Sequence, residues 1–285
     1  MLNSLTILAP GLLGGSLGMA CHKQGLAKRI GVWARRAETR EACQKSDWCT
    51  DVFETAPEAC RASDLVVICT PVEHILPLIK QIAGELRPGT IVTDVGSTKA
   101  IISTAAPALL PEGCFFVGSH PMAGSEKSGL GHAVESLFKG NPCFITPLPE
   151  TPTSAIDAVG ALWKGVGMKL LETNPERHDQ LVARVSHLPH VIASALTVAV
   201  GQSDQPWKEA CGQGFRDTTR IAAGHPEMWR DICLQNREAL LDVLGDFQET
   251  LSQFTEALEE KNFDLLKDLF DEGRRYRRDL TAYDD

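Results

Sequence analysis

One segment of the sequence places a histidine among small and polar residues, a setting that suits chemistry. It runs from Gly118 to Gly129 with the sequence GSHPMAGSEKSG and follows the apolar run Phe115–Val117. Small residues allow a ligand to approach the backbone, and polar residues give it hydrogen-bonding partners. Imidazole changes its charge near neutral pH and is a common general acid or base. We therefore predict that His120 is catalytic, although a histidine without such neighbours is more often a packed or surface residue.

A second segment of the same character is Asp94–Lys99, with the sequence DVGSTK. It follows the apolar run that starts at Ile91, so it lies at the end of another predicted strand. Its small and polar residues again suit the approach of a ligand. Ser97 is also suited to cap a helix that starts in GSTK, and capping is compatible with a role at the ligand.

A glycine-rich turn lies between the first predicted strand and the first predicted helix. Residues 9–16 read APGLLGGS, so an alanine and two glycines occupy the spacing of the Gly-x-Gly-x-x-Gly dinucleotide fingerprint. Gly11 would let the backbone approach a pyrophosphate, and Gly14 would let the helix pack closely on the strand. We expect a dinucleotide here, with Leu12 and Leu13 at the anion-binding start of the helix. The alternative is a strand–helix turn without a ligand.

The second predicted strand ends without the carboxylate that usually binds the ribose hydroxyls of NAD. The chain continues instead into Arg35 and Arg36. Arginine suits a ribose 2′-phosphate through its charge and its fork of donors. We therefore expect NADP in preference to NAD, although both arginines would also suit an ordinary helix start at the surface. Thr70 and Pro71 follow the third long strand, where they either border the cofactor or form a simple strand-to-loop turn.

Short apolar runs alternate with stretches of helical length in the first half of the chain. This βαβ rhythm predicts a mainly parallel sheet with helices on both faces, a Rossmann-type α/β domain. The predicted strands are Leu5–Ala9, Ile30–Trp33, Leu65–Thr70, Ile91–Asp94, Phe115–Val117, Cys143–Thr146 and Lys169–Glu172. A further helix is expected over Ser154–Trp163. We place the domain boundary near Thr173, so the first domain covers residues 1–173.

The second half, residues 174–285, has no strand signal and is expected to be all-helical. Asn174, Pro175 and Glu176 form a helix start, with a capping residue, a proline and an acid in order. The helix is expected to run to Val200, with a kink at Pro189.

Two apolar surfaces of the helical half predict a homodimer. Apolar residues from Leu240 to Leu258 alternate in spacings of four and three, which puts one stripe along a long helix. The segment His190–Val200 is apolar on nearly all sides and is expected to be buried. Together they exceed what a small helical domain can cover, so a second subunit is the expected partner.

Composition and charge narrow the class of protein. The 285 residues are 43% hydrophobic and 23% charged, as in ordinary globular proteins. The net charge of −9 repels phosphate backbones, which argues against a nucleic-acid partner. Nine cysteines include no Cys-x-x-Cys pair, which argues against zinc and against a disulfide framework. We expect no signal peptide and no apolar stretch of about 18 residues, and hence a soluble cytoplasmic protein without a membrane partner.

Six motifs, taken together, resemble the prephenate and arogenate dehydrogenases of tyrosine biosynthesis. In chain order they are GLLGGSL, DVGSTK, GSHPMAGSEKSG, SHLPH, GFRDTTRIA and MWRDI. The resemblance extends from Ile7 to about Leu280, and it departs from the family at Ala9 and at Arg35–Arg36, which concern the cofactor. It implies a Rossmann domain followed by an all-helical dimerisation domain. Because this core accounts for the chain, we expect no appended regulatory or chorismate mutase domain.

The resemblance implies an oxidative decarboxylation in which hydride passes from a cyclohexadienol to NAD(P). Prephenate would give 4-hydroxyphenylpyruvate, and arogenate would give tyrosine. His120 matches the family's catalytic histidine, which takes the hydrogen bond of the reacting hydroxyl. Ser97 matches a serine that bonds the same hydroxyl or orients the histidine. Arg220 matches the arginine that binds a substrate carboxylate through a bidentate fork.

Five further residues are placed at the substrate by the resemblance. His190 would face the pocket, and the nearby His187 is a weaker candidate; no partner residue supports a metal site at this pair. Arg216 and Asp217 would lie at the domain interface, where a helix-end salt bridge is an equal alternative. Trp229 would wall the pocket or simply pack in the core. Glu126 would lie at the pocket mouth, either pairing with the ammonium of arogenate or gating the site through a protein arginine.

Two other functions compete with this interpretation. An NADP-linked β-hydroxyacid-type dehydrogenase would need a catalytic lysine in the helical domain, yet no lysine occurs between Lys169 and Lys208. A non-catalytic NADP-binding sensor would keep Gly11 and Gly14 but would lose the reacting residues, which this chain retains.

Overall fold

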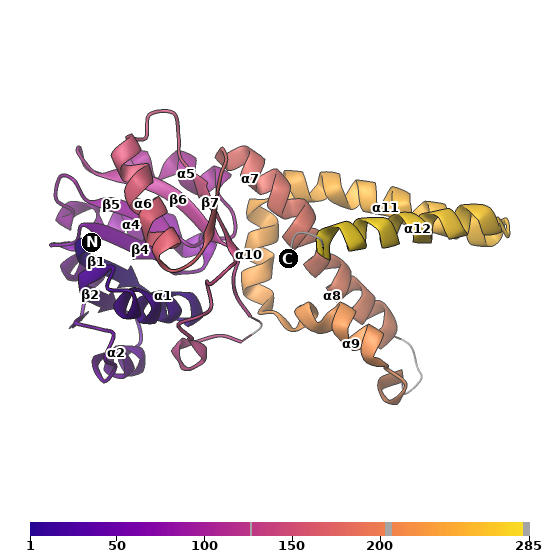
Figure 1. Cartoon of the computed structure of the whole chain (residues 1–285), viewed down its shortest axis with the longest axis horizontal. Coiled ribbons are helices and arrows are strands. Elements are labelled where there is room, and N and C mark those ends of the chain that lie inside the picture. Colours follow the sequence, from indigo (N-terminus) through magenta and orange to yellow (C-terminus); the bar gives the residue numbers. More distant parts are fainter. Residues whose placement is uncertain (126, 203–206, 282–285) are drawn as a thin grey trace. The chain divides into compact units, whose positions relative to one another are not determined.

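The computed structural model describes residues 1–125, 127–202 and 207–281 (Figure 1). The chain divides into two compact units, Met1–Arg237 and Glu238–Asp285. Within the first unit, the last strand ends at Glu172 and the next helix begins at Pro175, on either side of the expected boundary near Thr173.

A single mixed sheet forms the centre of the first unit. Its strands lie in the order β3-β2-β1-β4-β5-β6-β7-β8, and neighbours pair in parallel except β6 with β7. The mainly parallel α/β fold that the sequence predicts is therefore confirmed. The strands are β1 (Leu2–Leu8), β2 (Ala27–Trp33), β3 (Asp51–Phe53), β4 (Leu65–Ile68), β5 (Ile91–Asp94), β6 (Phe115–Pro121), β7 (Pro142–Thr146) and β8 (Lys169–Glu172).

Helices cover both faces of this sheet and create two apolar cores. Strand β4 shows why: Leu65 and Val67 enter one core, whereas Val66 and Ile68 enter the other. Successive side chains of a strand point to opposite faces, so a strand covered on both sides reads as one continuous apolar run. The covering helices are α1 (Leu12–Lys23), α2 (Ala37–Gln44), α3 (Ala56–Cys60), α4 (Val72–Ile82), α5 (Ala100–Ala105) and α6 (Thr153–Gly165).

Strand β6 is longer than the sequence suggests. The prediction ended it at Val117, but pairing with β7 continues from Gly118 to Pro121 in the antiparallel sense. His120 is therefore inside a strand, opposite Phe144, and not in the loop beyond it. The sequence did not predict this extension because glycine and proline are uncommon inside strands. Pairing with β7 nevertheless holds the segment in an extended conformation.

The helices after the sheet begin as predicted. The side chain of Asn174 caps the first of them by accepting a hydrogen bond from the Arg177 backbone at 2.7 Å. The helical segment continues through Pro189 to Gly201, and a π-helical turn over Ala183–His187 changes the hydrogen-bond ladder just before the proline. The helices are α7 (Pro175–Val182), α8 (Leu188–Gly201), α9 (Gln213–Thr219) and α10 (Pro226–Gln235).

The continuous helical segment Pro175–Gly201 has 27 residues and is long and apolar enough to cross a membrane, which differs from the sequence expectation. Only 22% of its most apolar window is buried. Its first half nevertheless carries the buried polar residues His178, Asp179 and His187, which face other protein groups. In its second half Ala193 is buried, whereas Leu196 and Val198 are 36% and 56% exposed. Length and composition alone do not separate a membrane helix from one covered by protein.

The second unit is a helical hairpin of α11 (Arg237–Glu259) and α12 (Phe263–Thr281). The predicted stripe from Leu240 to Leu258 lies on α11, where Phe254 meets Phe270 of α12 edge to face at 5.3 Å. Several large apolar side chains of the hairpin stay exposed, among them Leu251, Leu258, Phe263 and Phe270.

Candidate active site

The glycine-rich turn follows β1 at the carboxyl edge of the sheet. Ala9 adopts a left-handed backbone with φ of 65°, which costs a residue with a Cβ about 1–2 kcal/mol and explains why glycine is usual there. A Cβ on Gly14 would lie 3.0 Å from Ile7 Cγ2 and 3.1 Å from the Ala9 carbonyl. By contrast, the space around Gly11 is open, with nothing within 4 Å of such a Cβ. The turn thus combines close helix–strand packing with free room beside the backbone.

Strand β4 ends beside this turn and contributes a polar group. The Oγ1 atom of Thr70 is buried and makes no hydrogen bond within the described part of the chain. Buried polar groups in proteins are normally paired, so an unpaired one calls for an explanation such as a ligand. Pro71, which follows it, is exposed and precedes α4. The open space at Gly11 and the unpaired Thr70 hydroxyl both fit a bound dinucleotide.

The end of β2 is strongly cationic. Arg35 and Arg36 are exposed, and Arg36 stands immediately before α2. Sequence reasoning missed Arg40, which donates to the Ala34 carbonyl at 2.8 Å and pairs with Glu54 at 2.8 Å. Arg40 therefore fixes the turn after β2, and its charge is offset by that of Glu54.

The loop after β5 is held by a buried ion pair. Lys99 and Asp94 are fully buried and bonded to each other. Asp94 also accepts hydrogen bonds from the Gly96 backbone at 2.8 Å and from the Ser119 backbone at 3.1 Å. Two charges removed from water remain stable only with such additional partners. Asp94 thus ties the loop of Ser97 to strand β6, one residue before His120.

His120 is 7% exposed and leads into a line of buried polar groups. Its Nδ1 lies 2.9 Å from Nε2 of His178, whose own Nδ1 lies 2.7 Å from a carboxylate oxygen of Asp179. Burial, followed by the charges of His178, Lys99 and His187, holds the pKa of His120 well below its usual value. The ring is therefore neutral near pH 7, as a proton acceptor requires.

Sequence reasoning missed His178 and Asp179, although one signal was available. Both lie in a helix start rich in charged residues, which normally faces solvent. Their spacing from Pro175 and Val182, however, puts all four on one helical face, and that face is buried. Polar residues on the apolar face of a helix are the pattern that could have revealed them.

Ser97 lies in the loop between β5 and α5 and is half-buried. Among the described residues no hydrogen bond joins its side chain to His120. The neighbouring Thr98 Oγ1 donates to Gln235 of α10 at 2.7 Å, so this loop is attached to the helical region. The loop therefore bridges the sheet edge and the helices around the candidate site.

A second cluster, formed by His190, Trp229 and Arg220, lies among the helices. The rings of His190 and Trp229 are stacked with centroids 3.6 Å apart. Burial lowers the pKa of His190 to about 4, and the nearby charge of Arg220 also lowers it. His187 contacts the same indole edge to face at 6.1 Å and accepts from Asn236 at 3.1 Å. The structure thus brings together three residues that the sequence assigned to the substrate.

The remaining predicted substrate residues are less informative. Arg216 donates to the Cys211 carbonyl at 3.2 Å, and Asp217 accepts from Gln213 at 2.6 Å. Both side chains are exposed and both contacts are local to α9, so the salt bridge considered as their alternative role is not the observed arrangement. Glu126 lies outside the described residues.

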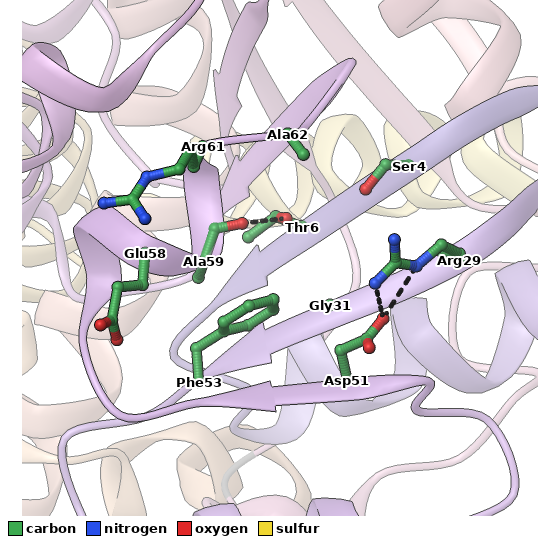
Figure 2. Close-up of a pocket in the computed structure, with 10 residues that line it drawn as sticks. All are labelled: Ser4, Thr6, Arg29, Gly31, Asp51, Phe53, Glu58, Ala59, Arg61 and Ala62. Carbon is green, nitrogen blue, oxygen red and sulfur yellow. Dashed lines mark hydrogen bonds and ion pairs between the residues drawn. The ribbon is translucent and has the colours of Figure 1, made fainter.

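A pocket elsewhere in the first unit involves different residues (Figure 2). It lies among β1, β2, β3 and α3, and an ion pair of Arg29 with Asp51 at 2.9 Å forms one side. It contains none of the residues that the sequence assigns to cofactor or substrate. Its complete lining is Ser4, Thr6, Arg29, Gly31, Asp51, Phe53, Glu58, Ala59, Arg61 and Ala62.

Comparison with known proteins extends over nearly the whole chain. Residues 17–172 match the nucleotide-binding domain of prephenate dehydrogenase, and residues 174–272 match its dimerization domain. Prephenate dehydrogenase from Bacillus subtilis is 33% identical over 98% of this chain and 76% of its own length. Cyclohexadienyl dehydrogenase from Zymomonas mobilis is 31% identical over 98% and 96%.

Solved structures agree with these sequence matches. The structure of prephenate dehydrogenase from A. aeolicus, in complex with hydroxyphenyl propionate and NAD+, superimposes with a TM-score of 0.92. That protein is 27% identical, and the match covers 98% of this chain and 99% of that one. The resemblance stated from the six motifs is confirmed.

Proposed function

The chain belongs to the prephenate dehydrogenase family, and from this premise we propose that it decarboxylates prephenate or arogenate oxidatively with NAD(P). The full-length similarity leaves the two competing functions, a β-hydroxyacid-type dehydrogenase and a non-catalytic sensor, without support. The reaction belongs to the biosynthesis of tyrosine.

The observation that supports this proposal most directly is the position of His120. It is a buried, neutral histidine near the carboxyl end of β6, the edge of the sheet at which such folds bind their ligands. The turn around Gly11 and the unpaired Thr70 hydroxyl lie at the same edge, after β1 and β4. A base and a nucleotide cradle at one edge suit hydride abstraction beside a hydroxyl.

We propose that the dinucleotide is held by Gly11, Leu12, Leu13, Gly14, Thr70 and Pro71, and when bound it would supply the acceptor for hydride from the hydroxyl-bearing ring carbon. His120 accepts the hydroxyl proton as the carbonyl forms, and loss of carbon dioxide then makes the ring aromatic. Ser97, on the loop fixed by Asp94, would bond the same hydroxyl or hold the histidine.

The helical cluster would bind the other end of the substrate. Arg220 offers a guanidinium fork to a carboxylate, while His190 and Trp229 present a stacked, largely apolar wall. We propose Arg216 and Asp217 as substrate residues at the domain interface, and Glu126 as a residue of the pocket mouth. Glu126 could select arogenate by pairing with the ammonium group of that substrate. The values of kcat/KM for arogenate and for prephenate test this selection.

Turnover of prephenate and of arogenate, each with NAD and with NADP, tests the proposed function. Formation of reduced nicotinamide together with carbon dioxide from either substrate is the expected result. Absence of turnover with both substrates and both cofactors would exclude the proposed activity.

Cofactor choice gives a separate prediction, because we propose NADP as the preferred cofactor. The exposed Arg35 and Arg36 follow β2 where a carboxylate would select NAD, and Glu54 is already paired with Arg40. Arg35→Ala should therefore lower kcat/KM with NADP and change it little with NAD. The control is Arg29→Ala, at the opposite end of β2, which should affect neither. A clear preference of the unmodified enzyme for NAD would refute the assignment.

Assembly gives another prediction, because we propose a homodimer that covers the exposed part of α8. Leu196 and Val198 are exposed on that helix, and the same helix carries His190. Leu196→Glu should dissociate the dimer and lower activity, since the loss of a partner loosens the helix that places His190. Sedimentation of the variant and of Leu171→Glu, an exposed control on β8, provides the measurement. An unmodified protein that sediments as a monomer at micromolar concentration would contradict the interface.

We also propose a soluble, cytoplasmic enzyme without a membrane partner. The apolar second half of Pro175–Gly201 would be covered by the other subunit. The polar face of the first half is used by His178, Asp179 and His187, which contact protein groups.

A further inference from the structure

The buried contacts of His120 continue beyond its nearest partner. Nδ1 of His120 meets Nε2 of His178 at 2.9 Å, and Nδ1 of His178 meets Oδ1 of Asp179 at 2.7 Å. His178 is fully buried and Asp179 is 5% exposed, so water does not separate the three groups. Phe144 packs edge to face on the His178 ring at 5.1 Å and restricts its orientation.

Asp179 is itself held firmly by the backbone. Its Oδ1 accepts from the Lys99 N–H at 2.7 Å, and its Oδ2 accepts from the Ala100 N–H at 2.9 Å. An acceptor of two backbone donors and one imidazole donor is satisfied as a carboxylate. The direction of every hydrogen bond in the line therefore follows from this one group.

An ionised carboxylate can only accept, so His178 donates from Nδ1. When His178 is neutral, its Nε2 carries no proton and must accept from Nδ1–H of His120. When His120 is also neutral, its proton lies on Nδ1, and Nε2 is left as an acceptor. The carboxylate thus selects the tautomer of a histidine two hydrogen bonds away.

We propose that His178 and Asp179 are positioning residues that hold His120 with its Nε2 free to accept the hydroxyl proton of the substrate. This inference rests on the proposed function. Nε2 of His120 would take the proton from the substrate oxygen as bound NAD(P) supplies the hydride acceptor. After carbon dioxide has left, the same proton returns to the phenolate oxygen, so His120 is regenerated. Asp179 stabilises the transient positive charge on the paired imidazoles.

The titratable and charged groups around His120 and His178 influence the pKa values of both imidazoles, and hence the pH dependence of activity. Lys99 and Asp94 face it from the β5 side, His187 from the π-helical turn and Cys143 from β7. Burial is the largest influence on the pKa of His178 and lowers it, whereas the hydrogen bond to Asp179 raises it. Asp179 therefore favours the protonated imidazole, and its removal should lower the pKa of the pair.

The first test is the variant Asp179→Asn, assayed for kcat, KM and the pH dependence of kcat/KM. We expect kcat to fall by about 10- to 100-fold, below the full value of acid–base catalysis. We also expect KM to change by less than about threefold, and the acidic limb of the profile to move to lower pH. An unmoved acidic limb, whether kcat falls or not, would overturn the proposal. The control Glu73→Gln removes a carboxylate from the exposed His74 and should leave the limb in place.

A second pair of variants remains decisive if Asp179→Asn does not fold. In His178→Gln the amide can donate to Asp179 and accept from His120, whereas in His178→Phe neither bond is possible. We expect kcat of the glutamine variant to exceed that of the phenylalanine variant by about tenfold. Equal values at equal thermal stability and equal NADP affinity would mean that His178 only fills space.

Nitrogen-15 spectra of histidine-labelled enzyme test the tautomer without any turnover. The signals of His120 and His178 are assigned by their loss in His120→Asn and His178→Gln. A neutral His120 with its proton on Nδ1 supports the proposal, and one with its proton on Nε2 refutes it. A failure of the proposed function would appear separately, as no turnover of prephenate or arogenate by the unmodified enzyme.

Discussion

Replacement of His120 by asparagine should lower kcat by about 10² to 10⁴, the usual contribution of a general acid–base residue. Asparagine is close to histidine in size and can still hydrogen-bond the substrate hydroxyl, but it cannot take up a proton. KM should therefore change much less than kcat. The measurement is steady-state kinetics with saturating cofactor.

The pH dependence of the same variant gives an independent check. The pKa of His120 is held well below its usual value of 6.5, mainly by burial, so the unmodified enzyme should lose kcat/KM only at acidic pH. The residual activity of His120→Asn should lack this acidic limb. His74→Asn, on an exposed histidine of α4, is the control and should retain both rate and profile. Near-normal turnover in His120→Asn would remove the histidine from the mechanism.

The sheet was predictable because its signals are local. A short apolar run such as Leu65–Ile68 predicts a strand that is covered on both faces, and no information about distant residues is needed. The turn at Gly14 was predictable in the same way, because a glycine at this spacing is needed where the helix packs closely on the strand. Strand β3 was missed because it has three residues and begins with Asp51, so it resembles a loop until β2 pairs with it.

Local pattern could indicate that His178 and Asp179 are buried, but not that they contact His120. His178 and Asp179 are 58 and 59 positions away in the chain, and only the folded structure brings α7 against β6. Lys99 illustrates the same limit, because a lysine after a strand normally faces solvent. Its complete burial is possible because its ammonium group pairs with the equally buried Asp94. Site residues in motifs could thus be named early, whereas those that support them required the fold.

In the helical part, too, features set by neighbouring residues were predictable, whereas features set by tertiary contacts were not. Asn174 was a reliable helix start because capping involves only its nearest neighbours. The π-helical turn before Pro189 was not foreseen, since the packing of His187 between Asn236 and Trp229 is a tertiary effect. Aromatic stacking of His190 on Trp229 likewise joins segments that no periodicity connects.

Truncation of Arg220 to alanine should weaken substrate binding by about 2–4 kcal/mol, because a charge-assisted guanidinium fork is lost. This corresponds to an increase in KM of about 30- to 700-fold. Arg220 lies next to His190, whose pKa it helps to lower, and His190 stacks on Trp229. A carboxylate bound by the exposed Arg220 would therefore lie close to the stacked rings of His190 and Trp229.

Arg220→Lys separates charge from geometry in this prediction. Lysine keeps the positive charge but loses the planar fork, so its KM should lie between those of the unmodified enzyme and the alanine variant. Arg61→Ala, which removes an exposed arginine paired with Glu85 on the nucleotide-binding domain, is the control and should leave KM unchanged. With pH and salt fixed, an unchanged KM in Arg220→Ala would mean that another cation binds the ring carboxylate. A fall in kcat alone would instead place Arg220 in the chemical step, because binding that is equal in ground and transition states affects KM.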